Sequence, residues 1–155
     1  MKRLAINKQI LQDELHVELI GSIDEDSDFK EVQGLAQKSI SFDFKEVNMI
    51  NSCGIREWIK FIESMPEKST ITYNNCPQII IEQINMVHGF FRKGATIGSF
   101  YAPYFCESCQ KESKEHLKAI DVKNRKAPKI ECPKCGSEMD FDAIESQYFS
   151  FLGKV

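Results

Sequence analysis

Four of the six cysteines in this chain form two Cys-x-x-Cys pairs, and no other feature restricts the fold as strongly. The first pair is Cys106 and Cys109, the second is Cys132 and Cys135, and residues 110–131 separate them. Two such pairs can place four thiolates tetrahedrally around one metal ion. The pattern therefore predicts a small module that is stabilised by a metal, with these four cysteines as its ligands.

The two pairs and their spacer resemble a zinc ribbon, which implies a structural Zn²⁺ site. Gly136 after the second pair permits the tight turn of such a site, whereas Gln110 follows the first pair. Iron or an iron–sulfur cluster also suits four thiolates, and a disulfide within each pair is a further alternative. A catalytic zinc is disfavoured because four cysteines leave no open coordination position. His116 lies among charged residues of the spacer and is interpreted as a solvated side chain.

Residues 39–65 read as a strand, a sharp turn and a helix. Apolar residues alternate with polar ones up to Phe44, with the period of two of a strand that has one buried face. After the turn, apolar residues recur at helical spacing, at Ile55, Trp58, Ile59, Ile62 and Met65. Asn51 or Ser52 is predicted to be the N-cap of this helix.

This turn and the earlier Gly21-Ser22-Ile23-Asp24 resemble the STAS domain of anti-sigma-factor antagonists, over about residues 1–90. The resemblance implies an α/β fold, a layered sheet with helices, and binding to another protein such as an anti-sigma-factor-like kinase. The phospho-acceptor position of the family falls on Cys53, and its acidic position falls on Asn51. Phosphorylation by a serine kinase is therefore not expected, and a partner is expected to bind constitutively.

The predicted partner-binding surface is the turn with the exposed side of the following helix. It comprises Asn51, Ser52, Cys53, Gly54, Arg56, Glu57 and Lys60. Cys53 lies where the positive end of the helix dipole favours a thiolate, so a redox-reactive thiol is one interpretation. The other is a small, inert, partly buried residue in the place of serine.

The rest of the chain alternates strands with helices. Two strands are expected within residues 2–20, with a polar turn at residues 7–14 between them. A short helix is expected after a capping box at Asp28 and Glu31, with an apolar stripe of Phe29, Val32 and Ala36. A strand is predicted at residues 69–73 and a helix after Pro77 with Ile80, Ile84 and Val87 buried. Residues 95–105 are predicted to be extended. Their aromatic residues are interpreted as a seam between domains, with an exposed partner surface as the alternative; they are Phe100, Tyr101, Tyr104 and Phe105. We expect a STAS-like domain at 1–94 and a zinc-ribbon-like module with its connecting strand at 95–155.

Composition restricts the function further. The net charge is −3 and the pI about 5.7, so the chain lacks the basic character of a dedicated nucleic-acid binder. A basic spacer loop with interleaved acids still leaves nucleic-acid association as the alternative function. The sequence shows neither an export signal nor a run of about 18 apolar residues, so a cytoplasmic protein is expected. We expect a bacterial, non-enzymatic regulatory or scaffold protein that acts in signalling or transcription regulation. No nucleophile–base set or phosphate-binding loop indicates an enzyme.

Overall fold

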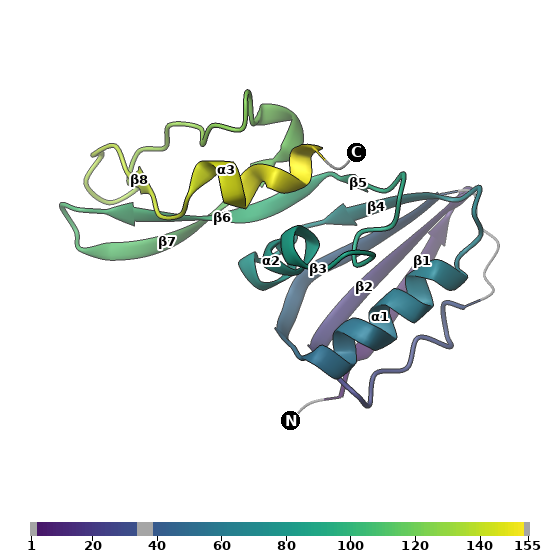
Figure 1. Ribbon diagram of the computed structural model, residues 1–155. Helices are drawn as coiled ribbons and strands as arrows, with labels where there is room; N and C mark the ends of the chain where they lie inside the picture. Colours follow the sequence, from purple (N-terminus) through teal and green to yellow (C-terminus); the bar gives the residue numbers. More distant parts are fainter. Residues whose placement is uncertain (1–2, 34–38, 154–155) are drawn as a thin grey trace.

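The computed structural model describes residues 3–33 and 39–153, which form two sheets joined end to end (Figure 1). The first sheet has the strand order β1-β2-β3-β4-β5, with bounds Ala5–Leu11, Glu14–Ile23, Ser39–Ile50, Thr70–Asn74 and Thr96–Ile97. β1 is antiparallel to β2, and the other neighbours are parallel. The second sheet is antiparallel, in the order β7-β6-β8, with β6 at Ser99–Cys106, β7 at Lys111–Lys118 and β8 at Asp140–Phe141.

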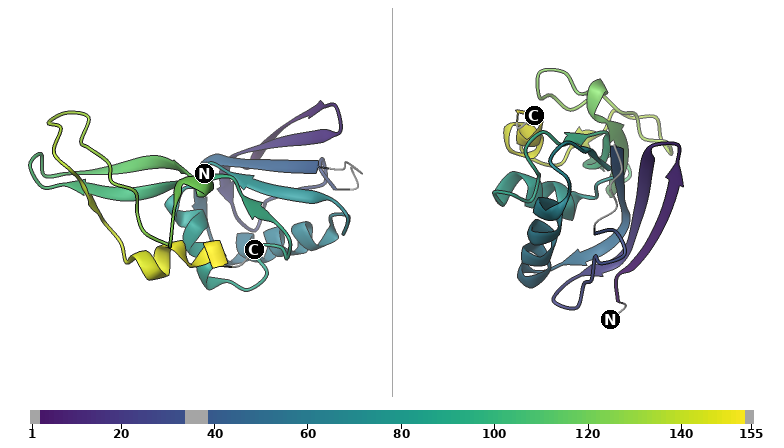
Figure 2. Two further views of the ribbon diagram at one scale, coloured as in Figure 1. Left: turned by 90° about the horizontal axis from the view of Figure 1, so that it is seen from above. Right: turned by 90° about the vertical axis from the view of Figure 1, so that its right-hand side faces the viewer.

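Helices α1 (Ser52–Ser64) and α2 (Gln78–Met86) cover one face of the first sheet, as Figure 2 shows from two further directions. The predicted strand alternation explains this, because Ile40, Phe42 and Phe44 all point into the buried layer. Trp58 of α1 is fully buried, and its indole nitrogen donates to the hydroxyl of Tyr73 at 3.2 Å. A buried polar group thus finds its partner inside the aromatic core.

The first hairpin is tighter than expected. β1 continues to Leu11 and β2 begins at Glu14, so the polar turn expected at residues 7–14 is wrong and only Gln12 and Asp13 connect the strands. Asn7 pairs with Glu18 across the hairpin, and its side chain donates to the Glu18 carboxylate at 3.1 Å. The segment looked like a loop because this edge strand carries polar residues on its solvent side.

The short helix expected after Asp28 is absent from described residues 28–33, which form hydrogen-bonded turns; Ala36 lies outside the described residues. The Asp28 carboxylate accepts a hydrogen bond from the Lys30 amide at 2.9 Å, an Asx turn that competes with helix initiation. Phe29 and Val32 are nevertheless buried as expected. Phe29 stacks on Phe61 of α1 with ring centroids 4.7 Å apart.

The predicted strand at residues 69–73 corresponds to β4, and the extended segment at 95–105 contains β5 and β6. β5 belongs to the first sheet although it follows residue 94. The predicted helix after Pro77 is α2, in which Ile80, Ile81 and Ile84 are buried while Val87 is half-buried beyond its end.

The spacer between the cysteine pairs is not simply a solvated loop, because β7 pairs with β6 along its whole length. The 3-10 helix η1 follows at Ala119–Asp121.

Aromatic rings close the junction between the two sheets. Phe100 of β6 is fully buried against rings of Tyr148, Phe149 and Phe151, which belong to helix α3 (Glu145–Tyr148) and the 3-10 helix η2 (Phe149–Gly153). Tyr104 instead packs against Phe141 inside the second sheet, so only part of the expected seam lies at the junction. Across the described residues, no helix has both the length and the apolar character needed to cross a membrane.

Candidate metal centre and the turn at residues 51–54

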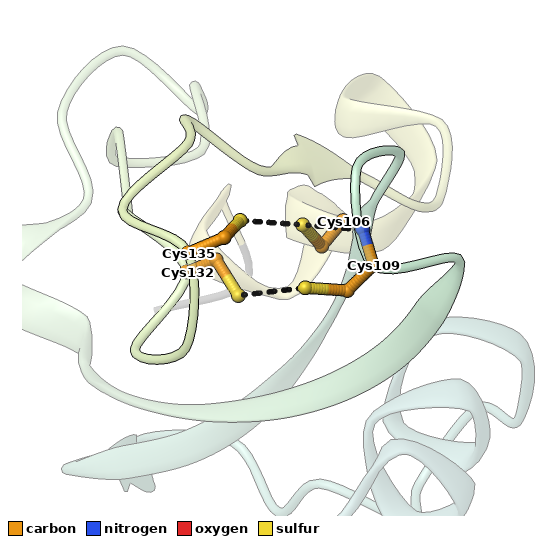
Figure 3. Close-up of side chains that lie close together, drawn as sticks. All are labelled: Cys106, Cys109, Cys132 and Cys135. Atoms are coloured by element: carbon orange, nitrogen blue, oxygen red, sulfur yellow. Dashed lines mark hydrogen bonds between the residues drawn. The ribbon is translucent and has the colours of Figure 1, made fainter.

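The four predicted ligands come from two turns that face each other at the end of the second sheet (Figure 3). Cys106 is the last residue of β6, and Cys109 lies in the turn that leads to β7. Cys132 and Cys135 lie in a second turn, closed by the bridge between Glu131 and Glu138. The hydrogen-bonded strands β6 and β7 thus position Cys106 and Cys109. The second turn places Cys132 and Cys135 opposite them.

The sulfur positions fit a tetrahedral metal site. All four Sγ atoms lie within 4.8 Å of one another. The distance between the Cys106 and Cys135 sulfurs is 3.5 Å, and that between Cys109 and Cys132 is 3.9 Å. A tetrahedron with metal–sulfur bonds of about 2.3 Å has sulfur–sulfur edges of about 3.8 Å. Only a small adjustment of the side chains is therefore needed for one ion to contact all four.

Both turns have the same backbone conformation after the second cysteine. Gly136 has a φ of +76°, and its amide donates to the Cys132 carbonyl at 2.9 Å. Gln110 occupies the matching position with a φ of +55°, a region that favours glycine. Its side chain donates to the Glu107 carbonyl at 2.6 Å, which ties this turn together. The missing glycine has therefore not changed the shape of the first turn.

Local hydrogen bonds give the thiols of the cluster different pKa values. Hydrogen bonds from the side chain and backbone of Ser137 lower the pKa of the Cys135 thiol to about 6. Hydrogen bonding to Cys135 and Cys106 raises the pKa of the Cys109 thiol to about 12. A cation at the centre of the cluster would stabilise every thiolate at once. The donor set thus fits zinc, and iron fits it as well.

All six cysteines are free thiols, so neither pair forms a local disulfide. Four thiolates fill a tetrahedral coordination sphere, which gives a bound ion a structural role. His116 is not part of the cluster. It is exposed, as expected, but its Nε2 donates to the Asn75 side chain at 2.8 Å.

The turn at residues 51–54 joins β3 to α1. Asn51, one of the two residues predicted as the N-cap, has this role, and its side-chain oxygen accepts from the Gly54 amide at 2.8 Å. The Asn51 amide nitrogen donates to the Glu25 carboxylate at 2.9 Å, and its backbone amide donates to the Ile23 carbonyl at 3.2 Å. A Cβ atom on Gly54 would lie 2.0 Å from the Ile23 carbonyl oxygen. The close approach of two backbones therefore requires glycine here.

The predicted partner-binding residues lie together on the first turns of α1. The exposed ones are Ser52, Cys53, Arg56 and Lys60, while Asn51 and Glu57 are half-buried and Gly54 is buried. The Lys60 ammonium lies 3.7 Å from the Glu57 carboxylate. The partly buried position considered for Cys53 is wrong, because its first-turn position directs it outward. Glu25 was missed from the sequence, where it stood only as one of several acids at residues 24–28.

The cysteine cluster and the turn at 51–54 lie far apart in the molecule. The cluster lies at the end of β6 and β7 that points away from the first sheet, whereas α1 begins after the C-terminal end of β3, at the bottom of the view (Figure 1). A scan against models of protein families finds none that matches the chain, and a search of curated proteins finds no match either. The relationship to STAS domains therefore remains a prediction.

Proposed function

We propose that this chain is a non-enzymatic regulatory or scaffold protein, in which a STAS-like interaction domain is joined to a structural zinc site. One observation carries the proposal: the two segments that resemble the family, residues 21–24 and 51–54, lie against each other. Asn51 donates to Ile23, and Gly54 packs on the same carbonyl. Residues 21–24 are themselves buried, so in this proposal they hold the turn at residues 51–54 in place, and the turn contacts the partner.

The metal has a structural part in this proposal. Cys106, Cys109, Cys132 and Cys135 would hold one zinc ion and fix the second turn onto the end of β6. Within residues 106–139 only Cys106, Leu117, Val122, Cys132 and Met139 are buried, so this part of the chain gains much of its folding free energy from such an ion. Free thiols suit a reducing compartment, so we place the protein in a bacterial cytoplasm, in signalling or transcription regulation.

The partner in this proposal is another protein, such as an anti-sigma-factor-like kinase. It would contact the turn at 51–54 and the side of α1 that carries Arg56, Glu57 and Lys60. Cys53 offers no hydroxyl to a serine kinase and Asn51 offers no carboxylate, so the partner would bind without phosphorylating the turn. Its affinity would then be the same with and without ATP.

Affinity isolation with matched variants tests this proposal. The wild-type chain, an Arg56→Glu/Lys60→Glu double variant and a Lys68→Glu control are each used to isolate partners, which are identified by mass spectrometry and measured by calorimetry. Lys68 is exposed beyond the far end of α1. The double variant is expected to bind at least about tenfold more weakly, and the control to bind normally. A partner that binds all three chains equally, or that phosphorylates residues 51–54, contradicts the proposal.

A second candidate function rests on the turn at residues 123–126. Asn124 and Arg125 both have left-handed backbone conformations, with φ of +54° and +56°, and a bridge joins Lys123 to Lys126. This rigid turn exposes three cations, and none of the ion pairs found among the described residues involves them. The turn would contact nucleic-acid phosphates, and a gel shift that weakens steeply with salt and with Arg125→Glu would support this function.

A further inference from the structure

Strand β3 has an open edge over its second half. β3 extends from Ser39 to Ile50, but β4 pairs only with residues Ser39 to Asp43. On the other side, β2 pairs with β3 as far as Ile50. Among the described residues, no backbone group pairs with residues 46–50 on the β4 side. The Lys45 amide donates to the Asp43 carboxylate at 2.9 Å, so the open stretch begins at Glu46.

A β-bulge shapes this open stretch. The register with β2 shifts between Glu18 and Ile20, so two residues of β3, Phe44 and Lys45, face the single Leu19. It shifts again between Gly21 and Ser22, so Asn48, inside the open stretch, has no residue of β2 opposite it. Beyond the bulge the buried position of β3 moves to Val47, while Glu46 and Asn48 are exposed. The bulge thereby turns an apolar side chain toward α2 and leaves the backbone edge accessible beside it.

A groove of about 680 Å³ lies along this edge. One wall is β3 at residues 45–48, and the other is formed by the first turns of α2 and by the β6–β7 ribbon. Apolar surface predominates, from Val47, Pro77, Ile79 and Tyr101. Two lysines and two glutamates also line the groove, so its charges balance. A phosphate or another anion would find no excess of positive charge here.

We propose that an extended segment of a partner protein binds in this groove and adds to the first sheet as a strand beside β3. Unpaired backbone donors and acceptors of a strand edge are complementary to an extended backbone and not to a compact small molecule. Every second side chain of the added segment points to one face of the sheet. An apolar side chain at such a position fills the space between Val47, Ile79 and Tyr101.

The groove leads to the turn proposed above as the partner surface, because β3 runs directly from residue 50 into Asn51. A bound strand would therefore end beside the N-terminus of α1. The inference extends the proposed interaction function to a second surface and does not depend on contacts by Arg56 or Lys60. Either surface can be tested while the other is left intact.

The test uses the full chain and a displayed library of randomised seven-residue peptides. A selected peptide is synthesised unmodified and in versions that are N-methylated at one residue each, and binding is followed by NMR. Amide signals of residues 46–50 are expected to shift and to exchange more slowly with solvent. N-methylation is expected to weaken binding roughly tenfold at alternate residues and to have little effect at the others, since only every second amide faces β3.

Protein variants locate the peptide independently. Ile79→Lys is expected to weaken binding roughly tenfold, whereas Met86→Lys, on the exposed side of the same helix, changes it little. The Arg56→Glu/Lys60→Glu variant should bind the peptide normally even if it loses its other partner. Failure to select any peptide, N-methylation effects without the period of two, or shifts confined to α1 would overturn the inference. Signals of residues 46–50 that shift with protein concentration alone would assign the edge to a second copy of the chain and would also overturn it.

Discussion

The side chains of Asn51 and Glu25 are joined by a hydrogen bond of 2.9 Å, which ties the start of α1 to the loop after β2. An amide is the group that fits between these partners, because its oxygen caps the helix while its nitrogen donates to a carboxylate. An aspartate at position 51 would place two like charges in contact. Asparagine therefore suits both neighbours of position 51, and aspartate would not.

Removal of the Asn51 side chain should destabilise the protein moderately. Asn51→Ala leaves the Gly54 amide without its capping oxygen, and such losses typically cost about 1 kcal/mol. Urea unfolding followed by circular dichroism measures the change. Ser52→Ala, at the next, exposed position, is the control and should alter the free energy of unfolding much less. If the two substitutions change the free energy of unfolding equally, the Asn51 side chain makes no specific contribution as a cap.

The ionisation of Glu25 should report the same contact. The hydrogen bond from Asn51 holds the pKa of the Glu25 carboxyl below its usual value. Because the folded pKa lies below the unfolded one, the ionised group stabilises the fold above the unfolded pKa, and this contribution is lost as pH falls through the folded pKa. In Asn51→Ala the Glu25 pKa should rise, as measured by an NMR titration of the carboxyl carbon. An unchanged pKa would assign the shift to another cause.

Gly54 should tolerate no side chain. Gly54→Ala places a methyl group 2.0 Å from the Ile23 carbonyl oxygen, so β2 and α1 must separate. We expect a loss of roughly 3 kcal/mol or more in the free energy of unfolding. Gly94→Ala is the matched control. Gly94 has a φ of +86° with no atom within 4 Å of the added group, so only backbone strain of about 1 kcal/mol is expected there.

Metal content should follow the four clustered cysteines. Protein purified without added metal is expected to contain about one zinc ion per chain. Cys132→Ser should lose the metal and the ordered structure of residues 106–139, while Cys53→Ser should keep both. Elemental analysis and NMR spectra measure the two outcomes. Stoichiometric iron would replace zinc as the resident ion, and wild-type protein with four free thiols and no metal would contradict the site.

Cysteine labelling should separate the two remaining thiols. Cys53 is exposed, whereas Cys76 is fully buried and burial raises the pKa of its thiol. Iodoacetamide at near-neutral pH should therefore modify Cys53 in the native protein while Cys76 reacts only after unfolding. Mass spectrometry of the labelled peptides distinguishes the sites. Equal rates for both thiols in the native state would contradict the burial of Cys76.

Sequence periodicity predicted the elements that bury one clear face. The alternation up to Phe44 predicted the first half of β3, and the helical spacing around Trp58 predicted α1 with Asn51 or Ser52 as its cap. The cysteine spacing likewise predicted the cluster, because four ligands at short intervals leave few arrangements. Local chemistry was sufficient in each of these regions.

Regions shaped by distant contacts were harder to predict. β7 consists almost entirely of polar residues, and only its pairing with β6 along the chain makes it a strand. The second half of β3 was hidden by the bulge at Phe44 and Lys45, which shifts the period of the buried residues. Glu25 could not be recognised as a partner of Asn51, because nothing near it in the sequence indicates the contact.

The covering of α2 has a consequence for the order in which the protein can fold during synthesis. Ile80, Ile81 and Ile84 face a core that also contains Phe100, and this core is closed by Phe149 and Phe151. The ribosome adds these last two rings only after every strand of the first sheet, which ends with β5 at Ile97. Until residues 149–151 emerge, the apolar side of α2 next to Phe100 therefore lacks its last cover.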